Sequence, residues 1–257
     1  MISPQAFIDP SAKIGKNVEI YPFAYIEKNV EIGDNCIIMP YVSIMSGTRL
    51  GEGNSVFQNT VLGATPQDFN YTGEETTLII GHNNVIRENV VINRATHAKD
   101  KTVLGNNNTL FEGVHLSHDS HVADDCSFGY GVKVSGNCTI DSHAILGSQV
   151  VVQQGAHVAS WTLVRGGCRF SKDIPPYIVV AGNPTHYYSV NELVLSQNGI
   201  PEHIQKHIAN AYRLIYQGNT SIFDSLKRIH EQVPMSEEIE EIIRFVETSE
   251  EGRGIIK

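Results

Sequence analysis

Four titratable residues lie within the short segment HLSHDSH, namely His115, His118, Asp119 and His121. An imidazole with a pKa near neutrality can remove a proton from an alcohol, so the segment could supply a general base. Histidines in this number could instead bind zinc, or simply lie on a polar surface. The elements that position them decide among these three interpretations.

An aliphatic residue returns at every sixth position between Ile8 and Val164. Of these 27 positions, 24 are Ile, Leu, Val or Phe. Neither an amphipathic helix nor an alternating strand keeps a period of six over so long a stretch, whereas a solenoid whose flat sides each use six residues requires it. The period predicts a mainly β fold, a parallel β-helix from Ile8 to about Arg169, within a first domain of residues 1–180.

The three exceptions to the period are Asp68, Glu74 and Ala98, in the polar stretches TPQDFNYTGEET and RATHAKDKT. We expect loops that project from the solenoid near residues 63–79 and 97–103. Regular but unusual coils remain an alternative, because the stretches preserve the phase of the repeat. Loops on a rigid scaffold often carry binding groups.

The fifth position of each hexad carries small residues, which suits the narrow interior of the solenoid. All four cysteines occupy this position: Cys36, Cys126, Cys138 and Cys168. We expect them to be small buried side chains in a reducing compartment, neither disulfides nor metal ligands.

Three hexads complete one coil, so residues 18 apart should stack at roughly 4.8 Å, the spacing of neighbouring strands. Gly136 then lies one coil beyond His118, and Gln154 two coils beyond it. A glycine N–H beside an imidazole suits acyl transfer, since it could stabilise an oxyanion. A zinc site is less well supported, because the positions one coil beyond the histidines hold Lys133, Gly136 and Thr139.

The repeat ends after Arg169, where KDIPPY provides a stiff exit. Beyond it, apolar residues recur at spacings of three and four, which is typical of helices. We expect a small helical domain over residues 181–257, with helices in 200–216, 221–229 and 236–246, the last capped by Ser236. Such a domain would cover the strand edges at one end of the solenoid.

The formal net charge of -9 argues against a general nucleic-acid-binding protein. The N-terminus does not resemble a signal peptide, and no apolar stretch is long enough to span a membrane. The expected location is therefore the cytoplasm.

Several segments resemble those of a known family: HLSHDSHV, GGCRFSKDIPPYIV, AGNP, PQDFNYTGEETT, IRENVVINRAT and NAYRLIYQ. They are similar in sequence, order and spacing to the acyl carrier protein-dependent UDP-N-acetylglucosamine acyltransferases that begin lipid A synthesis. The resemblance implies a left-handed β-helix and a homotrimer with active sites in clefts between neighbouring helices. It also implies transfer of a 3-hydroxyacyl chain from acyl carrier protein to the 3-hydroxyl of the UDP-sugar, with no metal or redox cofactor.

Position by position, the resemblance makes His118 the general base, Asp119 its orienting partner and Gly136 the backbone donor to the oxyanion. It implies that Gly166 helps to set the acyl length. The implied sugar-nucleotide contacts are His115, Gln67, Asp68, Gln154 and Asn191.

Several positions depart from the family pattern. Asn70 stands where a lysine is usual, Asn137 and Gln153 replace histidines, and Gln197 and Asn198 replace an arginine pair. Neutral amides bind phosphate more weakly than arginine does. Either other groups such as Arg165 or Arg169 hold the phosphates, or the substrate is a different nucleotide sugar. Arg165, Arg169 and Lys172 could equally receive the acidic carrier protein or form a solvated surface.

Four alternatives follow. A related N-acyltransferase is disfavoured because such enzymes carry an extra N-terminal domain, whereas here the hexads begin at Ile8. An acyltransferase for another nucleotide sugar or amino-sugar and a diverged paralog both fit the altered positions. A zinc-dependent hydratase on the same fold would require stoichiometric metal.

Overall fold

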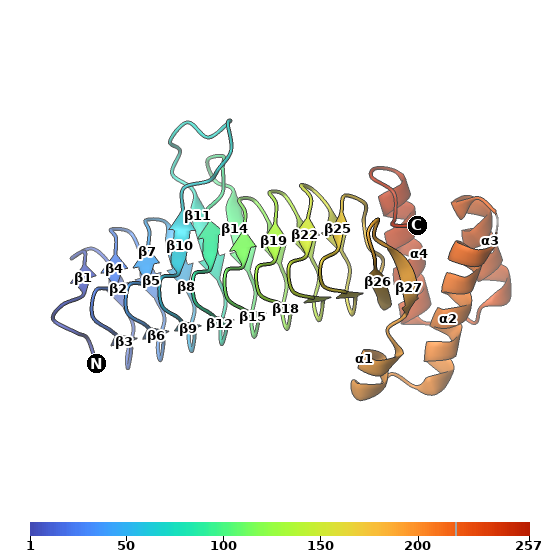
Figure 1. Cartoon of the computed structure of the whole chain (residues 1–257), viewed down its shortest axis with the longest axis horizontal. Helices are drawn as coiled ribbons and strands as arrows, with labels where there is room; N and C mark the ends of the chain where they lie inside the picture. The colour runs from blue at the N-terminus through green and yellow to red at the C-terminus, as the bar shows by residue number, and fades with distance from the viewer. Residues whose placement is uncertain (219) are drawn as a thin grey trace.

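The computed structural model describes residues 1–218 and 220–257 and is a long rod with helices at its C-terminal end (Figure 1). Short parallel strands wind around the rod and form three sheets. One sheet, here called the first face, contains β1 (Phe7–Ile8), β4 (Tyr25–Ile26), β7 (Ser43–Ile44), β10 (Val61–Ala64), β13 (Val91–Asn93), β16 (His115–Leu116), β19 (Lys133–Val134), β22 (Val151–Val152) and β25 (Arg169–Phe170).

The other two faces have the same construction. The second face contains β2 (Lys13–Ile14), β5 (Glu31–Ile32), β8 (Thr48–Leu50), β11 (Thr77–Ile80), β14 (Lys101–Leu104), β17 (His121–Val122), β20 (Thr139–Ile140) and β23 (His157–Val158). The third contains β3 (Glu19–Ile20), β6 (Ile37–Ile38), β9 (Ser55–Val56), β12 (Val85–Ile86), β15 (Thr109–Leu110), β18 (Ser127–Phe128), β21 (Ile145–Leu146), β24 (Leu163–Val164), β26 (Ile178–Ala181) and β27 (His186–Val190).

The hexad rule determines which side chains fill the interior. The second residue of each two-residue strand is apolar and, from Ile20 onward, buried, while its predecessor faces outward. Many turns between strands place Asn or Gly where the backbone is left-handed, as at Asn35 with φ 58°. Coils stack with a spacing of 18 residues, for example Tyr25 beside Ser43. The predicted solenoid is therefore present.

The four cysteines are free and buried, as the fifth-position rule predicted. Burial raises the pKa of Cys126 to about 12 and that of Cys138 to about 11. Neither thiol is therefore ionised near neutral pH, and both act as small apolar side chains.

A ladder of buried amides runs through the middle coils. The Asn84 side chain donates to Asn54 Oδ1 and to the Gly105 carbonyl, both at 2.9 Å, and its own oxygen accepts from the N–H of Asn108. Asn108 Oδ1 in turn accepts from the N–H of Cys126. The three asparagines have no exposed surface, so these bonds replace the water that the amides lose on folding.

Two segments project from the rod at one edge, between the first and second faces (Figure 1). They occupy residues 65–76 and 94–100. Strands β11 and β14 begin at Thr77 and Lys101, so parts of the stretches expected near 63–79 and 97–103 are strand and not loop. They are strand because Leu78 and Thr102 are buried and pair with neighbouring coils.

The C-terminal part contains α1 (Glu192–Gln197), α2 (Glu202–Gln217), α3 (Ile222–Gln232) and α4 (Glu237–Glu250). Residues 181–257 were expected to form a small helical domain, but β27 pairs antiparallel with β26 before the first helix begins. This strand forms because Tyr187 packs inward and stacks on Tyr216 at a centroid distance of 4.2 Å. Ser236 does lie at the N-cap position of α4, but its side chain makes no capping bond, and Ile239 stands where a capping box would need Glu or Gln. Ser221 caps α3 instead.

Candidate active site

His118 lies at the edge of the rod from which the two loops project. Strand β16 ends at Leu116 and β17 begins at His121, so residues 117–120 form the turn between the two faces. Asp119 has the left-handed backbone of this turn, with φ 58°, and its N–H donates to Thr102 Oγ1 at 2.9 Å. His118 is buried at this turn, with 6% of its surface exposed.

His118 and Asp119 form a hydrogen-bonded dyad with 2.7 Å between Nδ1 and Oδ2. Burial opposes ionisation of Asp119, but hydrogen bonds from His118 and from the N–H and hydroxyl of Thr96 outweigh it and lower its pKa. An ionised carboxylate at this distance requires a proton on Nδ1. Nε2 is then unprotonated and can act as a base.

Thr96 is a site residue that the sequence did not reveal. Its N–H donates to Asp119 Oδ1 at 3.0 Å, and its Oγ1 lies 2.9 Å from His118 Nδ1. The residue comes from the second projecting segment, where no repeat predicts the path of the backbone. The only sequence signal was a hydroxyl residue within an insertion one coil before the histidine.

Gly136 lies against the face of the His118 ring, as the stacking rule predicted. The N–H of Asn137 donates to the His118 carbonyl at 3.1 Å, which fixes the two turns on each other. A Cβ on Gly136 would lie 2.5 Å from His118 Cε1 and 2.7 Å from Nε2. Only glycine therefore leaves room for the ring.

The N–H of Gly136 makes no hydrogen bond to any described residue. At another edge of the rod, the N–H at the same hexad position, that of Asn106, donates to the Asp124 carboxylate one coil further on. The corresponding position beyond Gly136 is Gln154, whose exposed side chain does not reach back. Among the described residues, the Gly136 N–H is consequently an unpaired donor in the residue that packs against the His118 ring.

The first projecting segment brings a second carboxylate to the ring. Asp68 Oδ2 lies 3.6 Å from His118 Nε2, on the side opposite Asp119, while Gln67 is exposed. Arg94 holds this loop: its guanidinium donates to the Gly63 carbonyl at 3.0 Å and to the Tyr71 hydroxyl at 2.9 Å. The N–H of Tyr71 in turn donates to the Asp68 carbonyl. Polar bonds therefore set the position of Asp68.

His115 lies on β16, and its Nε2 is 3.1 Å from Ser117 Oγ. Burial lowers the pKa of His115, and the positive charge of Lys133 lowers it further. His115 is therefore neutral near pH 7 and serves as a hydrogen-bonding group. His121 is exposed on the adjoining face and does not join the dyad.

The remaining expected site residues lie further along the rod. Gly166 is exposed in the turn after β24, and the buried Asn191 donates its amide to the Trp161 carbonyl at 2.9 Å. Within residues 1–218 and 220–257, no hydrogen bond links Gln154, Gly166 or Asn191 to His118. A single chain gathers Asp68, Thr96, Asp119 and Gly136 around His118, but not these three residues.

The positions that depart from the family pattern are also placed. The Asn70 amide donates to Asp68 Oδ1 at 3.0 Å. Gln197 ends α1, and Asn198 caps its C-terminus by donating to the Val194 carbonyl. Both side chains are uncharged amides, so neither position supplies a cation at this end of α1.

Of the three cationic side chains considered for binding phosphate or the carrier protein, two make contacts within the chain. The Arg165 guanidinium lies 4.0 Å from the centroid of the Tyr188 ring, and Lys172 donates to the Arg253 carbonyl. Arg169 is exposed on β25 of the first face.

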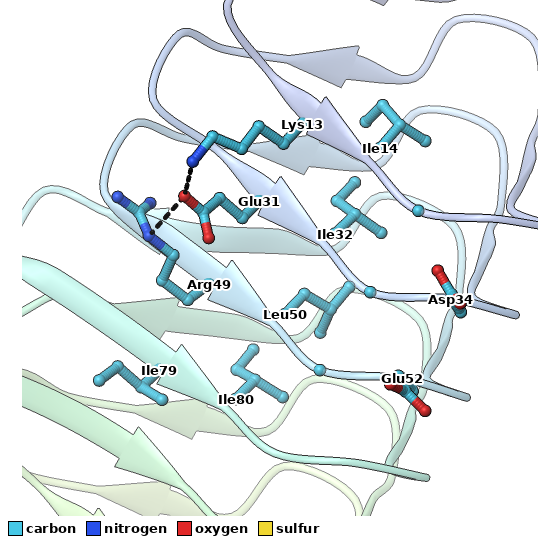
Figure 2. A pocket seen from close by; sticks show the side chains of 13 residues that line it. Lys13, Ile14, Glu31, Ile32, Asp34, Arg49, Leu50, Glu52, Ile79 and Ile80 are labelled. Atoms are coloured by element: carbon cyan, nitrogen blue, oxygen red, sulfur yellow. Dashed lines mark hydrogen bonds and ion pairs between the residues drawn. The ribbon is translucent and has the colours of Figure 1, made fainter.

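A separate hollow of about 450 Å³ lies on the second face near the N-terminus (Figure 2). Glu31 lies between Lys13 and Arg49 there, at 2.7 Å and 3.8 Å. Exposed ion pairs of this kind stabilise little, and the hollow contains none of the expected site residues. It is a solvated part of the rod and not a second active site.

In the part of the chain that the structure describes, no three His, Cys, Asp or Glu side chains are grouped so as to hold a metal ion. No described helix is both long enough and apolar enough to cross a membrane.

The repeats and the site together define a hexapeptide-repeat transferase. Residues 11–40 and 29–64 match the family model for bacterial transferase hexapeptide repeats. Residues 173–256 match that for domain 2 of UDP-N-acetylglucosamine O-acyltransferase.

Whole-chain relatives identify the family more closely. The chain is 32% identical over 257 residues to an acyl-[acyl-carrier-protein]–UDP-N-acetylglucosamine O-acyltransferase of Pseudomonas entomophila, covering 100% of this chain and 99% of that one. A UDP-N-acetylglucosamine acyltransferase structure from Bacteroides fragilis is 49% identical, with a TM-score of 0.98 and full coverage of both chains. That from Francisella novicida is 31% identical, with a TM-score of 0.93 and coverage of 100% and 94%.

The chain therefore belongs to the family of acyl carrier protein-dependent UDP-N-acetylglucosamine O-acyltransferases. The predicted fold class, a left-handed parallel β-helix followed by a small helical domain, is confirmed. The class of enzyme, an acyltransferase, is confirmed as well.

Proposed function

We propose that this protein transfers a 3-hydroxyacyl chain from acyl carrier protein to the 3-hydroxyl of UDP-N-acetylglucosamine, the step with which lipid A synthesis begins. The observation that carries the proposal is the His118–Asp119 dyad, against whose ring Gly136 packs, with its N–H unpaired among the described residues. A base beside an unpaired backbone N–H suits attack of an alcohol on a thioester, because the N–H can bind the oxyanion.

In the proposed mechanism, Nε2 of His118 takes the proton of the sugar 3-hydroxyl while the oxygen attacks the thioester carbonyl. The tetrahedral oxyanion accepts a hydrogen bond from Gly136 N–H. Collapse breaks the carbon–sulfur bond, and the leaving thiolate takes the proton back from the imidazolium. The products are the sugar ester and the carrier thiol, and Asp119 stabilises the imidazolium between the two steps.

Asp68 suits contact with the acceptor sugar, because its carboxylate already lies 3.6 Å from Nε2 and can accept a hydrogen bond from a neighbouring hydroxyl. The sugar-nucleotide contacts further include Gln67, His115, Gln154 and Asn191. Gly166 bounds the acyl chain. This set is the family pattern applied to the present chain.

We further propose that the site is completed in a homotrimer. Phe69, next to Asp68, is fully exposed in the single chain, which favours a partner surface over it. Sedimentation should give three times the 28.3 kDa chain mass. Phe69→Ser should weaken the assembly, and a monomeric parent protein would contradict this proposal. We expect the trimer to act in the cytoplasm.

The test is an acyl-transfer assay with purified protein, UDP-N-acetylglucosamine and 3-hydroxyacyl carrier proteins of several chain lengths. His118→Ala should reduce turnover by about 10² to 10⁴, the usual contribution of a general base. His121→Ala is a matched control, because that exposed histidine lies outside the dyad. If His118→Ala turns over like the parent, the base is wrongly assigned.

The nature of the acceptor group is tested in a second arm of the same assay. The parent is compared on UDP-N-acetylglucosamine and on the analogue with an amine at the 3-position. Faster transfer to the amine than to the hydroxyl would replace the proposed acceptor with an amino-sugar.

A further inference from the structure

The second projecting segment breaks the period just before the catalytic coil. Paired strands β13 and β16 are 24 residues apart instead of 18, which places residues 94–100 next to the turn that holds His118. Ala95 and Thr96 of this segment are buried, at 0% and 1% exposure. The insertion therefore delivers a buried residue to the dyad as well as forming a surface loop.

Both polar groups of Thr96 are directed at the dyad. Its N–H donates to Asp119 Oδ1 at 3.0 Å, while its Oγ1 lies 2.9 Å from His118 Nδ1. Asp119 Oδ2 takes the remaining direction, toward Nδ1 at 2.7 Å. Thr96 thus contacts both members of the dyad. Its N–H holds Oδ1 of the Asp119 carboxylate, while Oδ2 of the same carboxylate bonds the His118 ring.

The proton count sets the direction of these bonds. Nδ1 carries its proton toward the ionised carboxylate, so it cannot also accept the hydroxyl hydrogen of Thr96. The hydroxyl hydrogen is therefore available to Asp119, and an oxygen lone pair faces Nδ1–H. The Asp119 carboxylate and the Thr96 lone pair both favour the imidazolium over the neutral ring, because they place a negative charge and the negative end of a dipole beside Nδ1–H.

We propose that Thr96 is a positioning residue that aims the Asp119 carboxylate at His118 and raises the basicity of Nε2. The proposal rests on the proposed function only in that Nε2 is the base. Other charged or titratable groups face His118 as well: Asp68 from the first loop at 3.6 Å, His115 from β16, and Lys133 beyond it on β19. These groups stay unchanged when only the Thr96 hydroxyl is removed.

The test compares Thr96→Val with Thr96→Ser. Valine keeps the shape and the backbone N–H but lacks the hydroxyl, while serine restores it. A matched control is Thr162→Val, which removes a buried hydroxyl bonded to the Pro175 carbonyl, away from His118. The His118 ring is titrated by NMR in ¹⁵N-histidine-labelled full-length protein, with His118→Ala to assign its signal.

In Thr96→Val, the ring pKa should fall by about 0.5 pH unit, and the acid limb of kcat/KM should move with it. We expect kcat to fall about tenfold, with KM for the sugar nucleotide little changed. Thr96→Ser should restore the ring pKa, the acid limb of kcat/KM and kcat to their parent values. Thr162→Val should change none of these three quantities. An unchanged ring titration in Thr96→Val, or an equal defect in Thr96→Ser, would overturn the inference.

The two proposals can fail separately. The ring titration needs no substrate, so a parent protein that fails to acylate UDP-N-acetylglucosamine would refute the proposed function alone. A parent that acylates the sugar but whose His118 titration ignores Thr96 would refute only the role of Thr96.

Discussion

Replacing Gly136 by alanine would place a methyl group within the space of the His118 ring. The new Cβ would lie 2.5 Å from Cε1, 2.7 Å from Nε2 and 3.1 Å from Nδ1. Ordinary contacts between such atoms are about 3.5 to 4.0 Å, so the ring must retreat by roughly 1 Å. Gly136 does not have a left-handed backbone, so alanine adds no strain of its own.

The size of the effect follows from this displacement. A misplacement of about 1 Å in a catalytic group costs about 100-fold in rate, equivalent to about 2.7 kcal/mol of transition-state stabilisation. The 2.7 Å bond from Nδ1 to Asp119 would also have to lengthen. Because alanine retains the N–H, the oxyanion donor survives, and the loss reports on the position of the ring.

The assay is steady-state acyl transfer with saturating carrier protein and varied sugar nucleotide. For Gly136→Ala we expect kcat to fall about 100-fold, with KM changed far less, because Gly136 touches the base and not the nucleotide. Gly252→Ala is the control, since a Cβ there meets nothing closer than 3.9 Å. A folded Gly136→Ala protein with turnover within about twofold of the parent would refute the packing argument.

Three further predictions follow from other contacts. Folding lowers the pKa of Asp119, so its stabilisation is complete above the ordinary value of 3.8 and disappears as the pH falls through the lower folded value. Asp119→Asn should therefore unfold at lower urea concentration than the parent near neutral pH, and the difference should shrink below pH 3.8. Asn84→Ala removes the amide bonded to Asn54 and leaves a buried N–H unpaired, so the free energy of unfolding measured in urea should fall by about 2 to 4 kcal/mol. Tyr71→Phe removes the hydroxyl that accepts from Arg94, so KM for the sugar nucleotide should rise about threefold while kcat holds; an unchanged KM would count against this tether.

The period of six predicted the rod and part of the active site, because every coil has the same strand pairing and the same inward-facing positions. An apolar residue such as Ile38 must face inward, and a residue 18 positions on must stack above it. That rule alone placed Gly136 over His118. The rule is accurate because the backbone hydrogen bonds between parallel strands fix the spacing of the coils, whatever the side chains are.

The rest of the site lay outside the reach of the period. Asp68 and Thr96 come from insertions, whose backbone path depends on tertiary contacts such as the grip of Arg94 on Tyr71. The first strand of the C-terminal part was missed for a related reason. Tyr187 packs against Tyr216, which lies far along the chain, and the local sequence gives no sign of this contact.

The two insertions have a consequence for how such an enzyme can change over time. They lengthen the coils by twelve and six residues, yet the strands on either side still pair with the neighbouring coils, with one register shift between Leu62 and Ala64, and both leave the rod at the edge that carries His118. New sequence at this edge can therefore be acquired or lost without repacking the interior. The scaffold can evolve its substrate range, or be engineered toward a new acceptor, by exchanging residues 65–76 alone while the dyad stays in place.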